Sequence, residues 1–139
     1  MAFLIPNEIS SHLYGEVTTE INRGDATLLQ AAIDAAQEEA SGYLTAYDQA
    51  AIFAAVGDAR NPILLLYVKD ISVWHYIQLS NPAVEMELRM ERYKSAIKWL
   101  EKVQSGKTNP NLPYRAVVDP DVPANYLKTG SNLKRNNNF

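Results

Sequence analysis

The sequence predicts an all-α fold, a small bundle of about four helices followed by an extended C-terminal arm. Through most of residues 1–106, apolar residues recur every three or four positions, as they do on the buried face of a helix. Capping residues, prolines and glycines separate these stretches. Residues 107–139 contain seven of the eleven asparagines and four of the seven prolines, and these prolines block long helices. We therefore expect a helical domain over residues 1–106 and an extended Asn/Pro-rich arm over residues 107–139.

The first two helices are predicted from their end signals and from one apolar stripe. A short helix is expected to begin at Pro6 and to end at Gly15. A longer helix follows Asp25, an N-cap residue, and its Glu38 and Glu39 lie mostly outside the stripe, so we expect them on the solvated side. The stripe itself consists of Leu29, Ile33, Ala36, Ala40, Tyr43 or Leu44, and Tyr47.

The third helix is expected to be the central one. Residues 50–59 are expected to form an alanine-rich connection, after which Asn61-Pro62 supplies an N-cap and a proline at the first helical position. Residues 63–79 are apolar almost all round, so neighbours should cover most of this helix, including Leu66 and Ile71. Its Lys69-Asp70 pair allows two interpretations, an ion pair at the helix rim or a polar contact across a subunit interface.

Asn81-Pro82 repeats the capping signal and opens a last helix that is expected to end at Gly106. The short connection predicts that the last two helices form a tight antiparallel pair. The face expected to pack on the core consists of Met86, Met90, Tyr93, Ile97 and Leu100.

Composition and charge exclude several classes of protein. The chain has no cysteine, so it offers no disulfide, thiol nucleophile or thiolate metal site. Its first residues lack the basic region and the long apolar run of a signal peptide, and we expect a soluble intracellular protein. Residues 1–106 carry eight Lys/Arg against fourteen Asp/Glu, a balance of −6, whereas the arm carries five against two, a balance of +3. The acidic pI of 5.3 argues against a dedicated nucleic-acid binder.

No group of residues matches a known catalytic or metal-binding pattern. His75 lies on the apolar helix, where an imidazole bonded to a backbone group or a carboxylate is favoured over a ligand or base. Ser72 is three residues away, but hydrolysis also needs an orienting acid and an oxyanion hole. His12 is expected at the surface, and Asp119-x-Asp121 lacks the further ligands of a calcium loop. We expect no enzyme activity, no metal and no cofactor.

The arm combines helix-blocking prolines with apolar and aromatic side chains, which a disordered linker rarely carries. An extended chain of this kind can place successive side chains in pockets of another surface, and residues 114–118 are its best strand candidate. The alternative is a frayed, solvated terminus. Because body and arm have opposite charge, the arm of one copy is expected to dock on another. The expected partner-binding residues are Tyr114, Arg115, Val117, Tyr126, Leu127, Lys134, Arg135 and Phe139.

The order of these parts resembles a known family. The opening Met-Ala-Phe-Leu with a short helix is followed by an alanine-rich helix leading to Ser41-Gly42-Tyr43-Leu44. An apolar helix over residues 64–76 and a helix carrying Tyr93 and Trp99 come next. Over residues 1 to about 105 this pattern is similar to the head-tail connector (adaptor, head completion) proteins of tailed bacteriophages, particularly the Mu-like prophage branch. The motifs are packing patterns, and the arm does not align with the family.

The resemblance implies a structural virion protein without enzyme activity or cofactor, made in the bacterial host cytoplasm and placed in the neck at the head-tail interface. Its implied partners are copies of itself in a ring, commonly a dodecamer, the portal protein above it, and a tail or stopper protein. DNA would pass through the channel without specific binding, and no membrane is involved. The alternative from another class is a small helical nucleic-acid-binding or regulatory module, in which Arg115, Lys128, Lys134 and Arg135 would contact phosphates.

Overall fold

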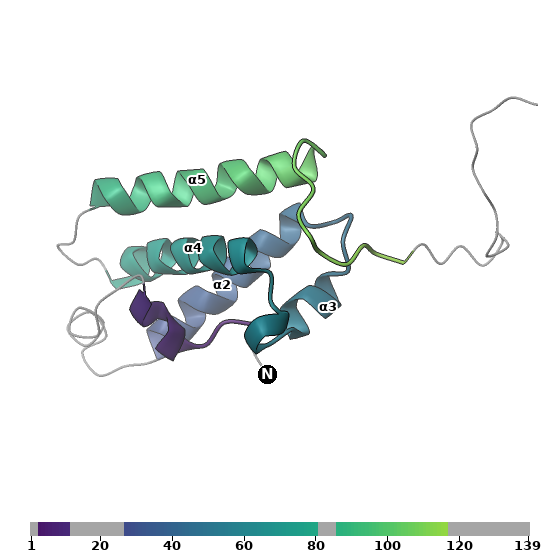
Figure 1. Cartoon of the computed structure of the whole chain (residues 1–139). Coiled ribbons are helices and arrows are strands. Elements are labelled where there is room, and N and C mark those ends of the chain that lie inside the picture. The colour runs from purple at the N-terminus through teal and green to yellow at the C-terminus, as the bar shows by residue number, and fades with distance from the viewer. Residues whose placement is uncertain (1–2, 12–26, 81–85, 117–139) are drawn as a thin grey trace, which may run out of the picture.

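The computed structural model describes residues 3–11, 27–80 and 86–116, and these ranges contain helices and no strand, which confirms the all-α prediction. Figure 1 shows the arrangement of the helices. The elements are a 3-10 helix η1 (Pro6–Ser11), α2 (Thr27–Tyr43), α3 (Gln49–Ala54), a 3-10 turn η2 (Gly57–Ala59), α4 (Pro62–Ser80) and α5 (Met86–Gln104).

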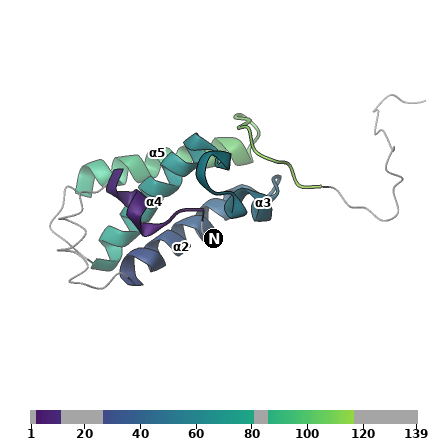
Figure 2. The same cartoon turned by 60° about the horizontal axis from the view of Figure 1, so that its bottom comes forward.

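Helix α4 lies between α2 and α5 and packs on both, most extensively on α2 (Figures 1 and 2). It runs antiparallel to α5, as the short connection predicted. The short helix α3 lies at the end of the bundle where α2 finishes and α4 begins, and η1 lies toward the opposite end. The result is a three-helix bundle with α3 and η1 added at its margins.

The predicted stripe of α2 is confirmed as part of the core. Its members at the five positions from Leu29 to Leu44 are buried, while Tyr43, the alternative to Leu44, is half-buried. The helix stops at Tyr43, and Leu44 and Tyr47 are held after it by turn bonds, Leu44 N to Ser41 O and Tyr47 N to Leu44 O, each 3.0 Å. The stripe therefore continues into the core beyond the end of the helix.

The prediction for α4 is confirmed at its start and partly wrong on its surface. Asn61 Oδ1 accepts hydrogen bonds from the amides of Ile63 and Leu64 at 3.1 and 3.0 Å, which is the predicted N-cap. Ile71 is fully buried as expected, but Leu66 is 47% exposed. Ile63 and Leu66 are one turn apart on a side of α4 that neither α2 nor α5 covers. An apolar perimeter therefore does not imply burial on every side.

The predicted core face of α5 is confirmed over its second part, where Leu100 is buried and Tyr93 and Ile97 pack against the core, and it is wrong at the start of the helix. Met86 and Met90 are exposed, and the buried residues are Ala96, Leu100 and Val103. Aromatic contacts hold this part of α5 on α4, because the Trp99 ring lies 5.2 Å from the Tyr67 ring and the Tyr93 ring lies 5.6 Å from the Trp74 ring.

The end of α5 follows the prediction. Gly106 adopts a φ of 80°, which suits a residue without a Cβ, and its amide bonds Val103 O at 3.2 Å. The signals at Gly15, Asp25 and Asn81-Pro82 lie outside the described residues.

Two features at the margins were not predicted. Residues 50–59 are not a simple connection, because α3 forms there with Asp48 Oδ1 accepting from Ala51 N at 3.1 Å.

The guanidinium of Arg60 binds both carboxylate oxygens of Glu8, at 2.7 and 2.9 Å, and donates to Phe3 O at 2.8 Å. The hydrogen bond to Arg60 lowers the pKa of Glu8 below its ordinary value. This contact joins the N-terminal segment to the chain just before α4.

Candidate functional site

A polar cluster connects the three long helices. Glu39 of α2 places Oε2 2.5 Å from Nε2 of His75 on α4, and its Oε1 accepts a hydrogen bond of 2.5 Å from the Tyr93 hydroxyl on α5. The side chains of His75 and Glu39 are 27% and 26% exposed. Of the two partners expected for His75, a backbone group or a carboxylate, the structure shows a carboxylate. The expectation that Glu39 lies on the solvated side is wrong, because its carboxylate reaches past the edge of α2 to the other two helices.

The surroundings of this cluster keep its groups in place. Trp74 stacks on Tyr93, and the His75 ring meets Tyr93 edge-on at 6.0 Å. Burial, together with the hydrogen bond to Glu39, raises the pKa of the Tyr93 hydroxyl, so this group stays a donor. The buried Ser72 hydroxyl donates to Val68 O at 2.7 Å and is thus engaged within its own helix. The cluster acts as a connection between helices, in which each polar group has a partner.

The first residues of the arm lie on the body of their own chain. Leu112 is only 8% exposed and belongs to the core. The Tyr114 ring stacks on Tyr47 with the ring centres 4.9 Å apart, and the two residues form an isolated antiparallel bridge. Backbone bonds accompany it, from Asp48 N to Pro113 O at 2.8 Å and from Arg115 N to Ala46 O at 3.1 Å. We call residues 108–116 the arm anchor.

The arm anchor changes the interpretation of the sequence. Tyr114, expected to bind a partner, contacts its own body first, although it remains 64% exposed. The arm has apolar residues on both sides of this point, and composition does not reveal which of them contact the same chain. Arg115, also expected to bind a partner, is exposed, and its backbone amide bonds Ala46 O. The described residues do not include the other expected partner-binding residues, residues 117 and 118 of the strand candidate, or the Asp119-x-Asp121 and His12 positions.

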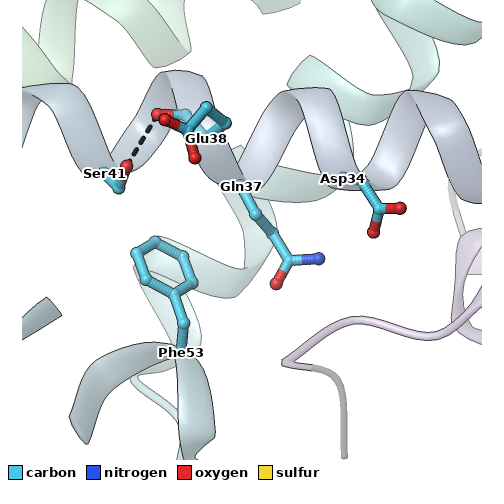
Figure 3. A pocket seen from close by; sticks show the side chains of 5 residues that line it. All are labelled: Asp34, Gln37, Glu38, Ser41 and Phe53. Carbon is cyan, nitrogen blue, oxygen red and sulfur yellow. Dashed lines mark hydrogen bonds between the residues drawn. The ribbon is translucent and has the colours of Figure 1, made fainter. Parts of the chain in front are cut away.

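A shallow pocket of about 230 Å³ lies between α2 and α3. Figure 3 shows the Phe53 ring of α3 pointing toward α2, where Asp34 and Glu38 are one turn apart. The same ring packs edge-on against Phe3, with ring centres 5.3 Å apart, so its position is fixed. Gln37 and Ser41 complete the lining. An aromatic wall with two carboxylates at its rim suits a long cationic side chain.

Within the described ranges, no group of three or more His, Cys, Asp or Glu residues is placed to hold a metal ion. None of the helices described there combines the length and apolarity that crossing a membrane requires. No protein-family model matches the chain, and searches of curated proteins and of solved structures find no match.

Proposed function

We propose that this chain is a structural subunit that assembles with copies of itself through its C-terminal arm, as a head-tail connector of a tailed bacteriophage. In this role it forms a ring beneath the portal protein in the neck of the virion and joins the capsid to a tail or stopper protein. The order of sequence elements described above suggests the family. The arm anchor is the observation that supports an assembly role most directly.

The arm anchor fixes where the arm leaves the body. Leu112, Tyr114 and the backbone bonds of Pro113 and Arg115 hold the chain at the end of the bundle near α3. Residues 117–139 then supply further apolar and aromatic side chains and three of the arm's basic ones. A binding segment that starts from a fixed point loses less freedom when it docks, so a modest contact with a neighbour becomes effective.

The body has surfaces that suit such a partner. Ile63 and Leu66 of α4 and Met86 and Met90 of α5 are all exposed. Single exposed apolar residues are normal in a monomer, whereas contiguous apolar patches mark contact surfaces, and each of these pairs lies within about one helical turn. The acidic balance of residues 1–106 also suits a body that attracts a basic arm and does not retain DNA passing through a channel.

Two truncations and sedimentation velocity test this proposal. Removing residues 117–139 keeps the arm anchor, so we expect a folded protein by circular dichroism that no longer assembles, alone or with the portal protein. Removing residues 107–139 also takes away Leu112 and Tyr114, and we expect it to lower the unfolding temperature as well.

Identical assembly of the full chain and the shorter truncation would contradict an assembly role for the arm. A full chain that stays monomeric with and without the portal protein would reject the connector proposal itself. If the same truncation removes salt-dependent retention on DNA instead, the nucleic-acid-binding alternative is favoured.

A further inference from the structure

Two exposed helix faces of opposite charge lie on different sides of the bundle. On α5, Lys94, Lys98 and Lys102 are exposed and follow one another at intervals of one helical turn, a spacing of about 6 Å. On α2, Asp34 and Glu38 are exposed with the same interval and stand at the rim of the pocket beside α3. We propose that the lysine row of one copy docks in the α2–α3 pocket of a second copy. This inference rests on the proposed self-assembly and names the surfaces that carry it.

The lysine row makes no ion pair with the described part of the chain. Glu101 is the one acidic residue between Lys94 and Lys107. A lysine in the last turn of a helix interacts favourably with the helix dipole, and this interaction accounts for the presence of Lys102. That effect fades within one turn, and α5 ends at Gln104, so it does not account for Lys94 and Lys98.

The pocket has the features that a lysine side chain requires. The Phe53 ring offers an apolar wall for the methylene groups, and the carboxylates of Asp34 and Glu38 at the rim can meet the ammonium group (Figure 3). A volume of about 230 Å³ is below the usual range for small-molecule sites and suits a single long side chain. Asp34 accepts one hydrogen bond, from Gln30 Nε2 at 2.9 Å, and it has capacity for more.

The two faces meet only between copies. The pocket lies between α2 and α3. Helix α5 packs on the far side of α4 from α2 (Figures 1 and 2), and its three lysines are exposed. Equal spacing lets two successive lysines face Asp34 and Glu38 together. Exposed small residues on the same side of α2, Ala31 and Ala35, permit close approach of a second helix. Because the two patches differ, the contact is head-to-tail and produces a ring or a filament, not a closed symmetric dimer.

Charge reversal in the full-length protein tests the inference. One variant carries Lys94→Glu and Lys98→Glu, and a second carries Asp34→Lys and Glu38→Lys. We expect each variant alone to associate at least tenfold more weakly than the wild type in sedimentation velocity, because like charges then face each other. An equal mixture of the two, and a single chain with all four changes, should associate again. The matched control is Arg92→Glu, an exposed reversal on α5 outside the row, which should leave association unchanged.

The outcomes separate this inference from the proposed function. Association of either variant at wild-type strength, or failure of the mixture to restore association, would overturn the docking of the lysine row. The inference would also be overturned if the Lys94→Glu and Lys98→Glu variant assembled normally but lost retention on duplex DNA, since the row would then be a phosphate site. A wild-type chain that never associates rejects both proposals, whereas association that depends on residues 117–139 and ignores the reversals rejects this inference alone.

Discussion

Helices α4 and α5 have the same length, 19 residues, but they contribute to the structure in different ways. Helix α4 contacts neighbours on two sides, while α5 packs chiefly on α4. Even so, α4 is not covered all round, since Ile63, Leu66 and Leu79 are exposed. Position in the bundle, more than composition, therefore decides which residues are buried. The buried residues are Leu64, Val68, Ile71, Ser72, Val73, Tyr76 and Ile77 on α4, and Ala96, Leu100 and Val103 on α5.

The polar groups of α4 and α5 also differ, in whether they have partners within the chain or face solvent. On α4, the Ser72 hydroxyl bonds its own helix and His75 contacts Glu39, so the polar groups facing the interior have partners. Burial also raises the pKa of Tyr76 to about 12, which keeps that phenol neutral. On α5, the lysines point to solvent without an ion pair to any described residue. The polar groups of the interior helix are thus engaged within the fold, whereas the lysines of the outer helix are exposed.

The largest effect should come from placing a charge at a buried position of α4. Leu64 is fully buried, so Leu64→Asp leaves an unpaired carboxylate in the core. We expect a cost of several kcal/mol, against a total stability of about 5–15 kcal/mol for a domain of this kind, and hence loss of the folded state. Circular dichroism with urea unfolding measures it. The control Leu64→Met keeps the volume and should cost less than about 1.5 kcal/mol. A folded Leu64→Asp protein with an unchanged urea midpoint would contradict the central position of α4.

The positions of α2, α4 and α5 could be predicted because their apolar periodicity and caps are local signals. The Asn61 cap and the Leu29 to Leu44 stripe required no knowledge of the partner helices. The exposure of Leu66 on α4 and of Met86 and Met90 on α5 could not be predicted in this way. Both depend on where α4 and α5 meet, which Tyr67 and Trp99 fix across the interface.

A medium loss of stability is expected from a substitution in the polar cluster that joins α4 and α5 to α2. Tyr93→Phe removes the hydroxyl that donates to Glu39 while keeping the ring against Trp74. Hydrogen bonds to charged groups contribute about 1.5–3 kcal/mol, and the partial exposure of Glu39 reduces this to an expected loss of about 1–2 kcal/mol in the free energy of unfolding. Urea unfolding at neutral pH is the measurement.

Tyr67→Phe is the matched control for this change. Tyr67 also lies in the α4–α5 interface, and the described part of the chain shows no hydrogen bond for its hydroxyl. We expect a change of about 0.5 kcal/mol or less, as for a substitution that removes no buried contact. If both variants lost equal stability, the bond to Glu39 would not be the source of the effect.

Less of the candidate site than of the fold could be predicted. A carboxylate was one of the two partners expected for His75, because a partly buried imidazole needs a polar partner, but its identity as Glu39 depends on the packing of α2 on α4. The arm anchor was missed because Leu112 and Tyr114 have the same apolar character as residues further along the arm. The pocket beside Phe53 was missed because α3 itself was not predicted.

The smallest effect on stability should come from a Leu→Asp change at an exposed position of α4, in contrast to Leu64→Asp at a buried one. Leu66 is two residues from Leu64 and 47% exposed, so Leu66→Asp puts the new carboxylate near water. We expect a loss of about 0.5 kcal/mol or less, measured by urea unfolding at a low protein concentration. If Leu66→Asp unfolded the protein as Leu64→Asp does, even at high dilution, the side of α4 with Ile63 and Leu66 would be covered within the chain and the comparison with α5 would fail. A loss that appears only at concentrations where copies associate would instead identify that side as part of the contact between subunits.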